Sequence, residues 1–244
     1  VFCCVGLGKS STLYAMLGDV ARLEINFFTV EDPVEFRMRG INQVQVNNKA
    51  GMTFAAALRS ILRADPDVVL IGEIRDQETA NIAIEASLTG HLVLSTLHTN
   101  DAPSAVTRLT EMGVEPFLLS SSLAAVMAQR LARRLCKKCK RQDTATEAEL
   151  RTLGVPHMPD TPLPTIWRPV GCRECANTGY SGRVAIQQVM GVDSTMEDLI
   201  ARGATSIDID KAAKEQGMTT LRKDGWQKAL QGITSVEEVL RVTV

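Results

Sequence analysis

The first half of the chain alternates short apolar runs with amphipathic segments. The runs at residues 25–31 and 68–72 carry apolar residues on both faces, as buried parallel strands do, and a third run covers 92–97. Between these runs, apolar positions recur at helical spacing over residues 10–22 and 53–63. This pattern predicts an α/β domain with a mostly parallel sheet over residues 1–135. A longer helix is predicted over 115–135, because its apolar positions fit one helix face and its last turn is basic.

The character of the sequence changes at about Cys136. Residues 140–171 contain five prolines and few long apolar runs, which predicts a loop-rich insert. After Gly182, helical patterns return at residues 194–203, 207–217, 219–231 and 235–241. The sequence therefore divides into a predicted core (1–135), a small cysteine-containing module (136–182) and a helical C-terminal region (183–244).

Composition narrows the class of protein. The 244 residues are 45% apolar and 23% charged, with a formal net charge of −1, as in a soluble globular protein of one or two domains. The near-neutral charge argues against a nucleic-acid protein that relies on bulk positive potential. No uncharged apolar stretch approaches the roughly 20 residues of a membrane helix, and Lys9 comes too early for a signal peptide. Because the first residue is Val1, we expect a fragment or a processed chain.

Gly8, Lys9 and Ser10 stand just before the first predicted helix. A phosphate-binding loop needs glycines to turn backbone N–H groups inward, a lysine for the terminal phosphates and a hydroxyl for Mg²⁺. The three residues supply the second half of the pattern G-x-x-x-x-G-K-[ST], whose first glycine is replaced by Cys3. A loop followed by an ordinary helix cap is the alternative.

Carboxylates follow two of the predicted strands. Glu73 ends the 68–72 run, the place where phosphate-loop ATPases direct an acid toward Mg²⁺ or the attacking water. Glu31, Asp32 and Glu35 close the 25–31 run and are candidates for a base that activates water. The alternatives are a solvated acid at a strand end and a simple turn built on Asp32-Pro33.

His91 and His98 flank the predicted strand 92–97. Seven residues apart, they would point to opposite faces of an unbroken strand, which argues against a shared metal ion. His98 falls at the same sheet edge as the acids, where it can sense a γ-phosphate. A structural, hydrogen-bonded histidine is the alternative.

Four of the six cysteines form two C-x-x-C pairs. Cys136 and Cys139 are separated by 32 residues from Cys172 and Cys175. Four thiolates complete a closed structural zinc site, and a metal stabilises this kind of core-poor segment. Two disulfides are the rival interpretation, which the missing export signal disfavours.

Taken together, these segments resemble the secretion ATPases of type IV pilus assembly and type II secretion. The segments that carry the resemblance are residues 29–36, 40–47, 72–76, 89–91, 95–102, 128–131, 178–183 and 239–243. The resemblance implies a RecA-like phosphate-loop core followed by a metal module. It also implies that Glu35 activates water, that Glu73 is the Walker B acid, and that His91 and His98 form the family's His box.

The resemblance further implies a motor that hydrolyses ATP with Mg²⁺. The expected nucleotide-binding residues are Gly6, Gly8, Lys9, Ser10 and Ser11, with Ser10 also a Mg²⁺ ligand and Zn²⁺ held by the four cysteines. Glu35, Glu73 and His98 are the expected catalytic residues. The implied partners are further copies of the chain in a hexamer and an inner-membrane platform protein, with no nucleic acid. The implied location is cytoplasmic, peripheral to the bacterial inner membrane.

The four-cysteine module is absent from the retraction ATPases of the same superfamily, so it favours pilus assembly or type II secretion, with assembly preferred. The resemblance also implies N-terminal domains before the phosphate loop, and because the sequence begins at that loop we expect it to be a fragment without them. Cys3 motivates an alternative, a degenerate zinc-stabilised assembly module that does not hydrolyse ATP. A RecA relative that translocates nucleic acid fits poorly, because only 10 of the 244 residues are aromatic.

Overall fold

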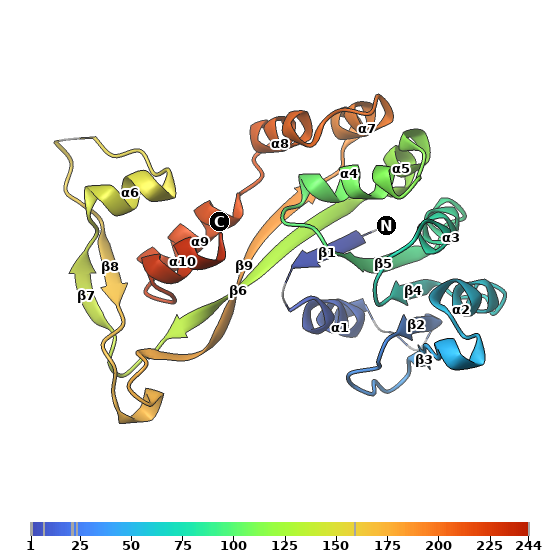
Figure 1. Cartoon of the computed structure of the whole chain (residues 1–244), viewed down its shortest axis with the longest axis horizontal. Helices are drawn as coiled ribbons and strands as arrows, with labels where there is room; N and C mark the ends of the chain where they lie inside the picture. The colour runs from blue at the N-terminus through green and yellow to red at the C-terminus, as the bar shows by residue number, and fades with distance from the viewer. Residues whose placement is uncertain (1, 7, 21, 23, 159, 244) are drawn as a thin grey trace. The chain divides into compact units, whose positions relative to one another are not determined.

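A computed structural model covers the chain and describes residues 2–6, 8–20, 22, 24–158 and 160–243. The first part of the chain (Figure 1) contains β1 (Phe2–Gly6), α1 (Lys9–Val20), β2 (Phe27–Glu31), β3 (Asn42–Gln45), η1 (Asn48–Ala50), α2 (Phe54–Ile61), β4 (Val68–Ile71), α3 (Gln77–Leu88), β5 (Leu92–Leu97), α4 (Pro103–Glu111) and α5 (Pro116–Ser122). The remainder contains β6 (Ala125–Leu135), β7 (Arg141–Thr144), α6 (Glu147–Leu153), β8 (Thr165–Arg168), η2 (Arg173–Cys175), β9 (Tyr180–Gly191), α7 (Ser194–Ala201), α8 (Ser206–Glu215), α9 (Leu221–Leu230) and α10 (Val236–Val242).

The chain divides into two compact units. One comprises Val1–Ala128 and Val189–Met218, and the other Gln129–Gln188 and Thr219–Val244. The strands β6 and β9 each contribute residues to both units. The three-part division by sequence stretch, with boundaries after residues 135 and 182, stays a prediction.

The predicted α/β class with a mostly parallel sheet is confirmed. The strand order is β3-β2-β4-β5-β1-β6-β9, and the pairs β2–β3, β2–β4, β4–β5 and β1–β5 are all parallel. Every residue of β4 is buried, because helices cover both faces of the sheet. In Figure 1 α1 lies on one side of these strands and α2 and α3 on the other.

The apolar face of α1 packs directly on the sheet. Its buried residues Leu13 and Leu17 form one core cluster with side chains of β2, β4 and β5, namely Phe27, Val68, Leu70 and Leu94. Side chains alternate along a strand, so the intervening Val69 and Ile71 face the other side. The sequence pattern predicted α1, β2, β4 and β5 because each buries a continuous apolar run or stripe.

The helix predicted over residues 115–135 is wrong beyond its first turns. The helix α5 ends at Ser122, Leu123 has extended backbone (φ −85°, ψ 114°), and the strand β6 follows. Residues 125–135 are rich in Ala, Leu, Arg and Gln, which favour helices in isolation. Pairing in the sheet between β1 and β9 satisfies the backbone of this segment instead, and that tertiary context outweighs the local preference.

The second unit has a core of its own. The strands β7 and β8 form an antiparallel ribbon, which the sequence pattern did not predict in the proline-rich segment. Buried residues of β8, α6, α9 and α10 meet in one cluster, which includes Ile166, Leu150, Trp226 and Val239.

The C-terminal helices predicted from the sequence are present as α7 to α10, within two or three residues of the expected bounds.

Candidate active site and metal centre

The carboxyl ends of β2, β4 and β5 lie beside the start of α1, around a pocket of about 310 Å³. Parallel strands deliver the residues that follow them to one edge of the sheet, where ligands bind in α/β folds. The pocket is lined by Lys9, Ser10, Glu31, Asp32, Pro33, Glu35, Gly72, Glu73, Arg75, Thr96 and His98. Lys9, Ser10, Glu35, Glu73 and His98, predicted from separate sequence segments, are therefore together in one pocket.

The start of α1 has the geometry of a phosphate-binding turn. Gly8 has a φ of +81°, which a glycine adopts without strain, and the Gly8 carbonyl accepts the N–H of Thr12 at 3.2 Å. Lys9 and Ser10 open the helix and line the pocket, where the helix N-terminus favours an anion. Gly6 ends β1, and Ser11 is exposed and outside the pocket lining. Leu7 falls outside the described residues.

Glu35 contacts the phosphate-loop serine. The Ser10 hydroxyl donates a hydrogen bond of 3.0 Å to Glu35 Oε1, between residues 25 positions apart. Glu35 itself is exposed and follows a turn whose Asp32–Pro33 peptide bond is cis. Within the part of the chain that the structure describes, the Glu35 carboxylate accepts this one hydrogen bond, so it keeps lone pairs with which to accept a proton from water.

Glu31 lies on the same strand end but has a different environment. Only 5% of it is exposed, and its carboxylate accepts hydrogen bonds from Thr29 (2.5 Å), Gln43 (3.2 Å) and the Tyr14 hydroxyl. Burial and the bond to Glu31 together raise the pKa of Tyr14 to about 12, so that the phenol stays protonated as the donor. Because three donors already hold its carboxylate, Glu31 is a structural acid, and Glu35 is the better candidate for a base.

Glu73 follows β4, and its carboxylate lies close to the side chains of Arg75 and His98. Its Oε2 lies 2.5 Å from Arg75 Nε and 3.4 Å from His98 Nε2. Only 13% of the side chain is exposed, and the ion pair with Arg75 holds the carboxylate at the edge of the pocket. A hard cation such as Mg²⁺ takes carboxylate and hydroxyl oxygens as ligands, and the pocket offers these from Glu73 and Ser10, so the residues present fit the ion.

The backbone at Gly72 approaches the end of β2 closely. A Cβ on Gly72 would lie 3.2 Å from the Val30 carbonyl oxygen and 3.3 Å from Glu31 Cα. The Gly72 carbonyl accepts a hydrogen bond of 2.6 Å from Thr96 on β5. Asp76 then caps α3 by accepting the Thr79 N–H at 2.7 Å. The segment that carries Glu73 is therefore fixed by neighbouring strands on one side and by a helix cap on the other.

The two histidines have separate surroundings. His98 is 74% exposed and lines the pocket. His91 lies outside the pocket lining, and its Nδ1 is 2.8 Å from the Ala86 carbonyl oxygen and 3.0 Å from Thr89 Oγ1. These contacts tie His91 to the C-terminal end of α3, so its position is that of a structural histidine.

The pocket holds more negative than positive charge. Its lining contains four carboxylates, Glu31, Asp32, Glu35 and Glu73, against the two permanent cations Lys9 and Arg75. An excess of acid beside a phosphate-binding turn favours a divalent cation that accompanies a phosphate. Sequence analysis missed Arg75 as a site residue, although it follows Glu73 by two positions at the same strand end.

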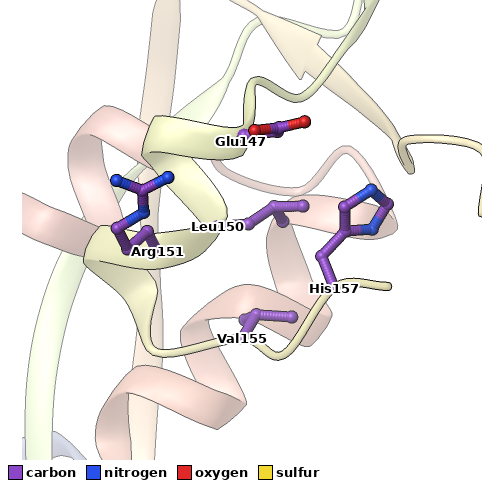
Figure 2. Close-up of a pocket in the computed structure, with 5 residues that line it drawn as sticks. All are labelled: Glu147, Leu150, Arg151, Val155 and His157. Atoms are coloured by element: carbon purple, nitrogen blue, oxygen red, sulfur yellow. The ribbon is translucent and has the colours of Figure 1, made fainter. Parts of the chain in front are cut away.

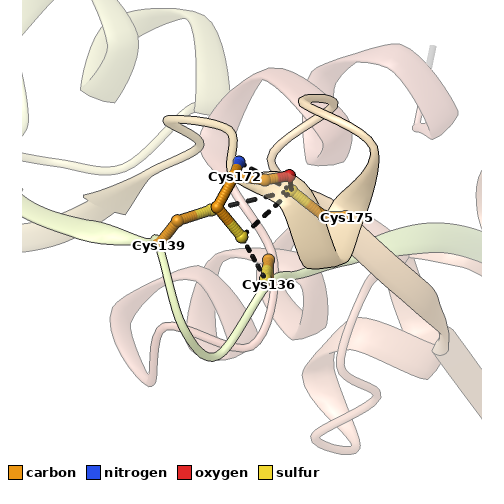
Figure 3. Close-up of side chains that lie close together, drawn as sticks. All are labelled: Cys136, Cys139, Cys172 and Cys175. Carbon is orange, nitrogen blue, oxygen red and sulfur yellow. Dashed lines mark hydrogen bonds between the residues drawn. The ribbon is translucent and has the colours of Figure 1, made fainter.

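The four predicted cysteines lie together in the second unit (Figure 3). Their sulfur atoms are all within 4.8 Å of one another, and neighbouring pairs are separated by 3.9 Å (Cys136–Cys172), 3.8 Å (Cys139–Cys175) and 3.7 Å (Cys172–Cys175). A tetrahedron with Zn–S bonds of about 2.3 Å has edges of about 3.8 Å, so the sulfurs fit a zinc ion. All four are free thiols, contrary to the disulfide alternative.

Backbone N–H groups point at two of these sulfurs. Burial opposes ionisation of Cys175, but the N–H groups of Cys172 (3.2 Å) and Gly179 (3.3 Å), together with the thiols of Cys172 and Cys139, outweigh burial and lower the pKa of Cys175 to about 6. At Cys139 burial dominates and raises the pKa to about 11, despite an N–H from Gly171 at 3.3 Å. Backbone donors around thiolates are the outer contacts that orient a metal's ligands.

A second pocket lies beside α6 (Figure 2). It has a volume of about 230 Å³ and is lined by Glu147, Leu150, Arg151, Val155 and His157. Leu150 and Val155 are apolar, and none of the predicted site residues is among the five. The pocket's polar residues, Glu147, Arg151 and His157, are not part of the metal-ligand cluster found among the described residues.

The chain is similar to secretion and pilus proteins over nearly its whole length. Residues 3–241 match the family model described as "Type II/IV secretion system protein". The chain is 54% identical to type II secretion system protein E of Pseudomonas aeruginosa, over 98% of this chain and 47% of that protein. It is 50% identical to the type IV pilus assembly ATPase PilB of Thermus thermophilus, over 98% of this chain and 27% of that protein.

A solved structure supports the fold. The pilus retraction motor PilT with bound ADP aligns with a TM-score of 0.72 and 24% identity, over 99% of this chain and 60% of that one. The chain spans about half the length of the Pseudomonas relative and about a quarter of the Thermus relative. Among the described residues, no helix combines the length and the apolar character that crossing a membrane requires.

Proposed function

This chain belongs to the family of type II/IV secretion system proteins, and we propose that it is the ATP-hydrolysing part of a motor for type IV pilus assembly or type II secretion. The observation that carries the proposal is the single pocket shared by Lys9, Ser10, Glu35, Glu73 and His98. The names of relatives at 50% identity or more support both biological outputs. The four-cysteine cluster fits the assembly and secretion branches, as the sequence analysis expects.

In the proposed mechanism, the start of α1 binds the phosphates of ATP. The turn at Gly8 presents backbone N–H groups, and the Lys9 ammonium neutralises the terminal phosphates. Gly6 and Ser11, on either side, complete the expected nucleotide-binding set. Ser10 and Glu73 would hold Mg²⁺, which neutralises charge that develops on the phosphoryl oxygens.

Glu35 is the proposed base. It accepts a proton from the attacking water, and its contact with Ser10 keeps its carboxylate at the phosphate-binding turn. His98, next to Glu73 and largely exposed, is placed to contact the γ-phosphate. Phosphoryl transfer depends on positioning and charge, so Lys9, Ser10, Glu35, Glu73 and His98 account for the proposed chemistry without a covalent intermediate.

The cysteine cluster has a structural role in the proposal. A closed set of four thiolates leaves no coordination position for substrate, so the zinc ion would stabilise the fold of the second unit. We expect the whole protein to work as a homo-oligomer, a hexamer in the family pattern, against a platform protein of the bacterial inner membrane. The proposed location is the cytoplasmic side of that membrane.

The test is Mg²⁺-ATP binding and turnover by the chain and by Lys9→Ala. We expect the unaltered chain to bind and hydrolyse ATP, and Lys9→Ala to bind at least about tenfold more weakly, since a charge-assisted phosphate contact is lost. Lys49→Ala, in the exposed turn η1, is the matched control and should behave as the unaltered chain. No binding by the unaltered chain, or equal binding by Lys9→Ala, would contradict the proposal.

A further inference from the structure

The segment that carries Glu35 is held by two glutamine side chains. Met38 N–H donates to Gln43 Oε1 at 2.8 Å, and Gln43 Nε2 donates to the Phe36 carbonyl oxygen at 2.9 Å. On the other side of Glu35, Val34 N–H donates to Gln45 Oε1 at 3.3 Å. Backbone groups on both sides of the proposed base are therefore bonded to β3.

The register of β3 explains why two glutamines can do this. β3 runs parallel to β2, with Gln43 beside Thr29 and Gln45 beside Glu31. Residues two apart on a strand share a face, so both amides lie on the same side of β3, next to the point where β2 ends. The segment 32–38 leaves β2 at that point and passes the two side chains.

A glutamine is suited to this position because its amide both donates and accepts. The Gln43 amide pairs with the carbonyl of one residue and the N–H of the residue two further on, as a neighbouring strand's backbone would. Its donor group also reaches the buried Glu31 carboxylate at 3.2 Å. One side chain thus joins the segment 36–38 to the end of β2.

The segment is also held from α1. The ring of Phe36 meets the ring of Tyr14 edge-on, with centroids 5.9 Å apart and planes at 74°. Tyr14 lies one helix turn after Ser10, and its hydroxyl donates to Glu31. The contacts from β3 and α1 converge on the residues that flank Glu35, where the Ser10 hydroxyl is bonded.

We propose that Gln43 and Gln45 are positioning residues that hold Glu35 at the phosphate-binding turn. This inference rests on the proposed function, because it assigns the glutamines to the water-activating step. Displacement of a catalytic group by about 1 Å can lower a rate about a hundredfold without removing the group. The glutamines should therefore affect turnover much more than nucleotide binding.

The kinetic test compares Gln43→Leu, Gln43→Glu and Gln45→Ala with the control Asn42→Ala. Asn42 is exposed on the same strand, and its amide bonds Asn26 instead of the Glu35 segment. We expect Gln43→Leu to lower kcat by about ten- to a hundredfold and to change the Mg²⁺-ATP Kd by less than about threefold. Gln43→Glu keeps the acceptor for Met38 but sets a carboxylate against the buried Glu31 carboxylate and the Phe36 carbonyl, so it should lower kcat at least as much as Gln43→Leu. Gln45→Ala should have the smaller effect of one lost bond.

Amide hydrogen exchange tests whether the two glutamines hold the Glu35 segment, and it does so without an activity measurement. Exchange at the Met38 N–H should rise in Gln43→Leu, and exchange at the Val34 N–H should rise in Gln45→Ala. Unchanged exchange at both amides would overturn the proposal, as would raised exchange with unchanged kcat or an equal loss of kcat and binding. If the unaltered chain shows no turnover, the proposed function fails, and the exchange data still decide whether the glutamines hold the segment.

Discussion

Ser10 Oγ donates a hydrogen bond of 3.0 Å to Glu35 Oε1. The hydroxyl hydrogen is used by the carboxylate, which leaves the lone pairs of the serine oxygen available to a cation. The expected Mg²⁺ ligand and the proposed base are therefore in direct contact, although one opens α1 and the other follows β2. The predictions below test this site and the metal centre separately.

Replacing the base should slow turnover without weakening nucleotide binding. Glu35→Gln keeps the size of the side chain and removes its capacity to take a proton from water, so kcat should fall by about a hundredfold or more. The Mg²⁺-ATP Kd should change by less than about threefold. Glu111→Gln, an exposed acid on α4, should leave both values unchanged. An equal loss of kcat and binding in Glu35→Gln would contradict the role of a base.

Cys3 should not prevent nucleotide binding. It lies within the strand β1, paired in register with Ser95 of β5, and extended backbone accepts a Cβ without strain. We therefore expect the chain and its Cys3→Gly variant to bind Mg²⁺-ATP with the same Kd, within about threefold. Tight binding by Cys3→Gly alone would instead support a degenerate site. Isothermal titration of both proteins distinguishes the two outcomes.

The cysteine cluster should bind one zinc ion per chain, and its loss should destabilise the second unit. Metal analysis of reduced protein is expected to give one equivalent, with Cys175→Ser giving markedly less and a lower Tm. Cys4→Ser, outside the cluster, is the control. Because thiolates bind the metal, zinc affinity should fall as the pH is lowered. Metal-free reduced protein with an unchanged Tm would refute the site.

Glu238 should stabilise the second unit above pH 4.5. Only 1% of this carboxylate is exposed, and it accepts hydrogen bonds from the guanidinium groups of Arg241 (2.7 and 2.9 Å) and Arg133 (2.6 Å). Burial alone would raise the pKa of Glu238, but these bonds outweigh burial and lower it to about 2. A depressed pKa in the folded state adds stability above the ordinary value of 4.5, and that stability is lost as the pH falls toward 2.

Glu238→Gln should therefore lower the free energy of unfolding by about 3 kcal/mol at pH 7. The difference between the two proteins should shrink progressively below pH 4.5, as measured by urea unfolding at a series of pH values. Glu147→Gln, an exposed acid of the same unit, should change the free energy of unfolding by less than about 0.5 kcal/mol at any pH. A pH-independent difference would show that Glu238 acts through packing alone.

The sequence predicts the parts of the fold that bury long apolar patterns. The strands β2, β4 and β5 and the helix α1 are of this kind, and because parallel strands end at one edge, their terminal residues could be expected to meet. The two C-x-x-C pairs predict that the four cysteines lie together, because this spacing is typical of thiols that share a metal ion. The individual roles of Glu35, Glu73 and His98 stay predictions.

Other features of the fold depend on which strands pair in the sheet, and the order of apolar and polar residues in the sequence does not predict them. The strand β6 has the composition of a helix, and only its neighbours in the sheet decide its conformation. β3 is a short, half-exposed strand without apolar alternation, so the function of Gln43 follows from the register with β2. Arg75 becomes visible as a site residue only when the end of β4 is placed beside the pocket.

Because Gly72 has no side chain, the ends of β4 and β2 can come into main-chain contact beside the pocket. The backbones of β4 and β2 are already so close there that one methyl group would be 3.2 Å from the Val30 carbonyl oxygen. The spacing between the ends of β4 and β2 is thus fixed at this point by contact of main chains. A Gly72→Ala substitution would force the two strand ends apart by a few tenths of an ångström, and the pocket residues that follow them, Glu73 and Asp32, would move with them.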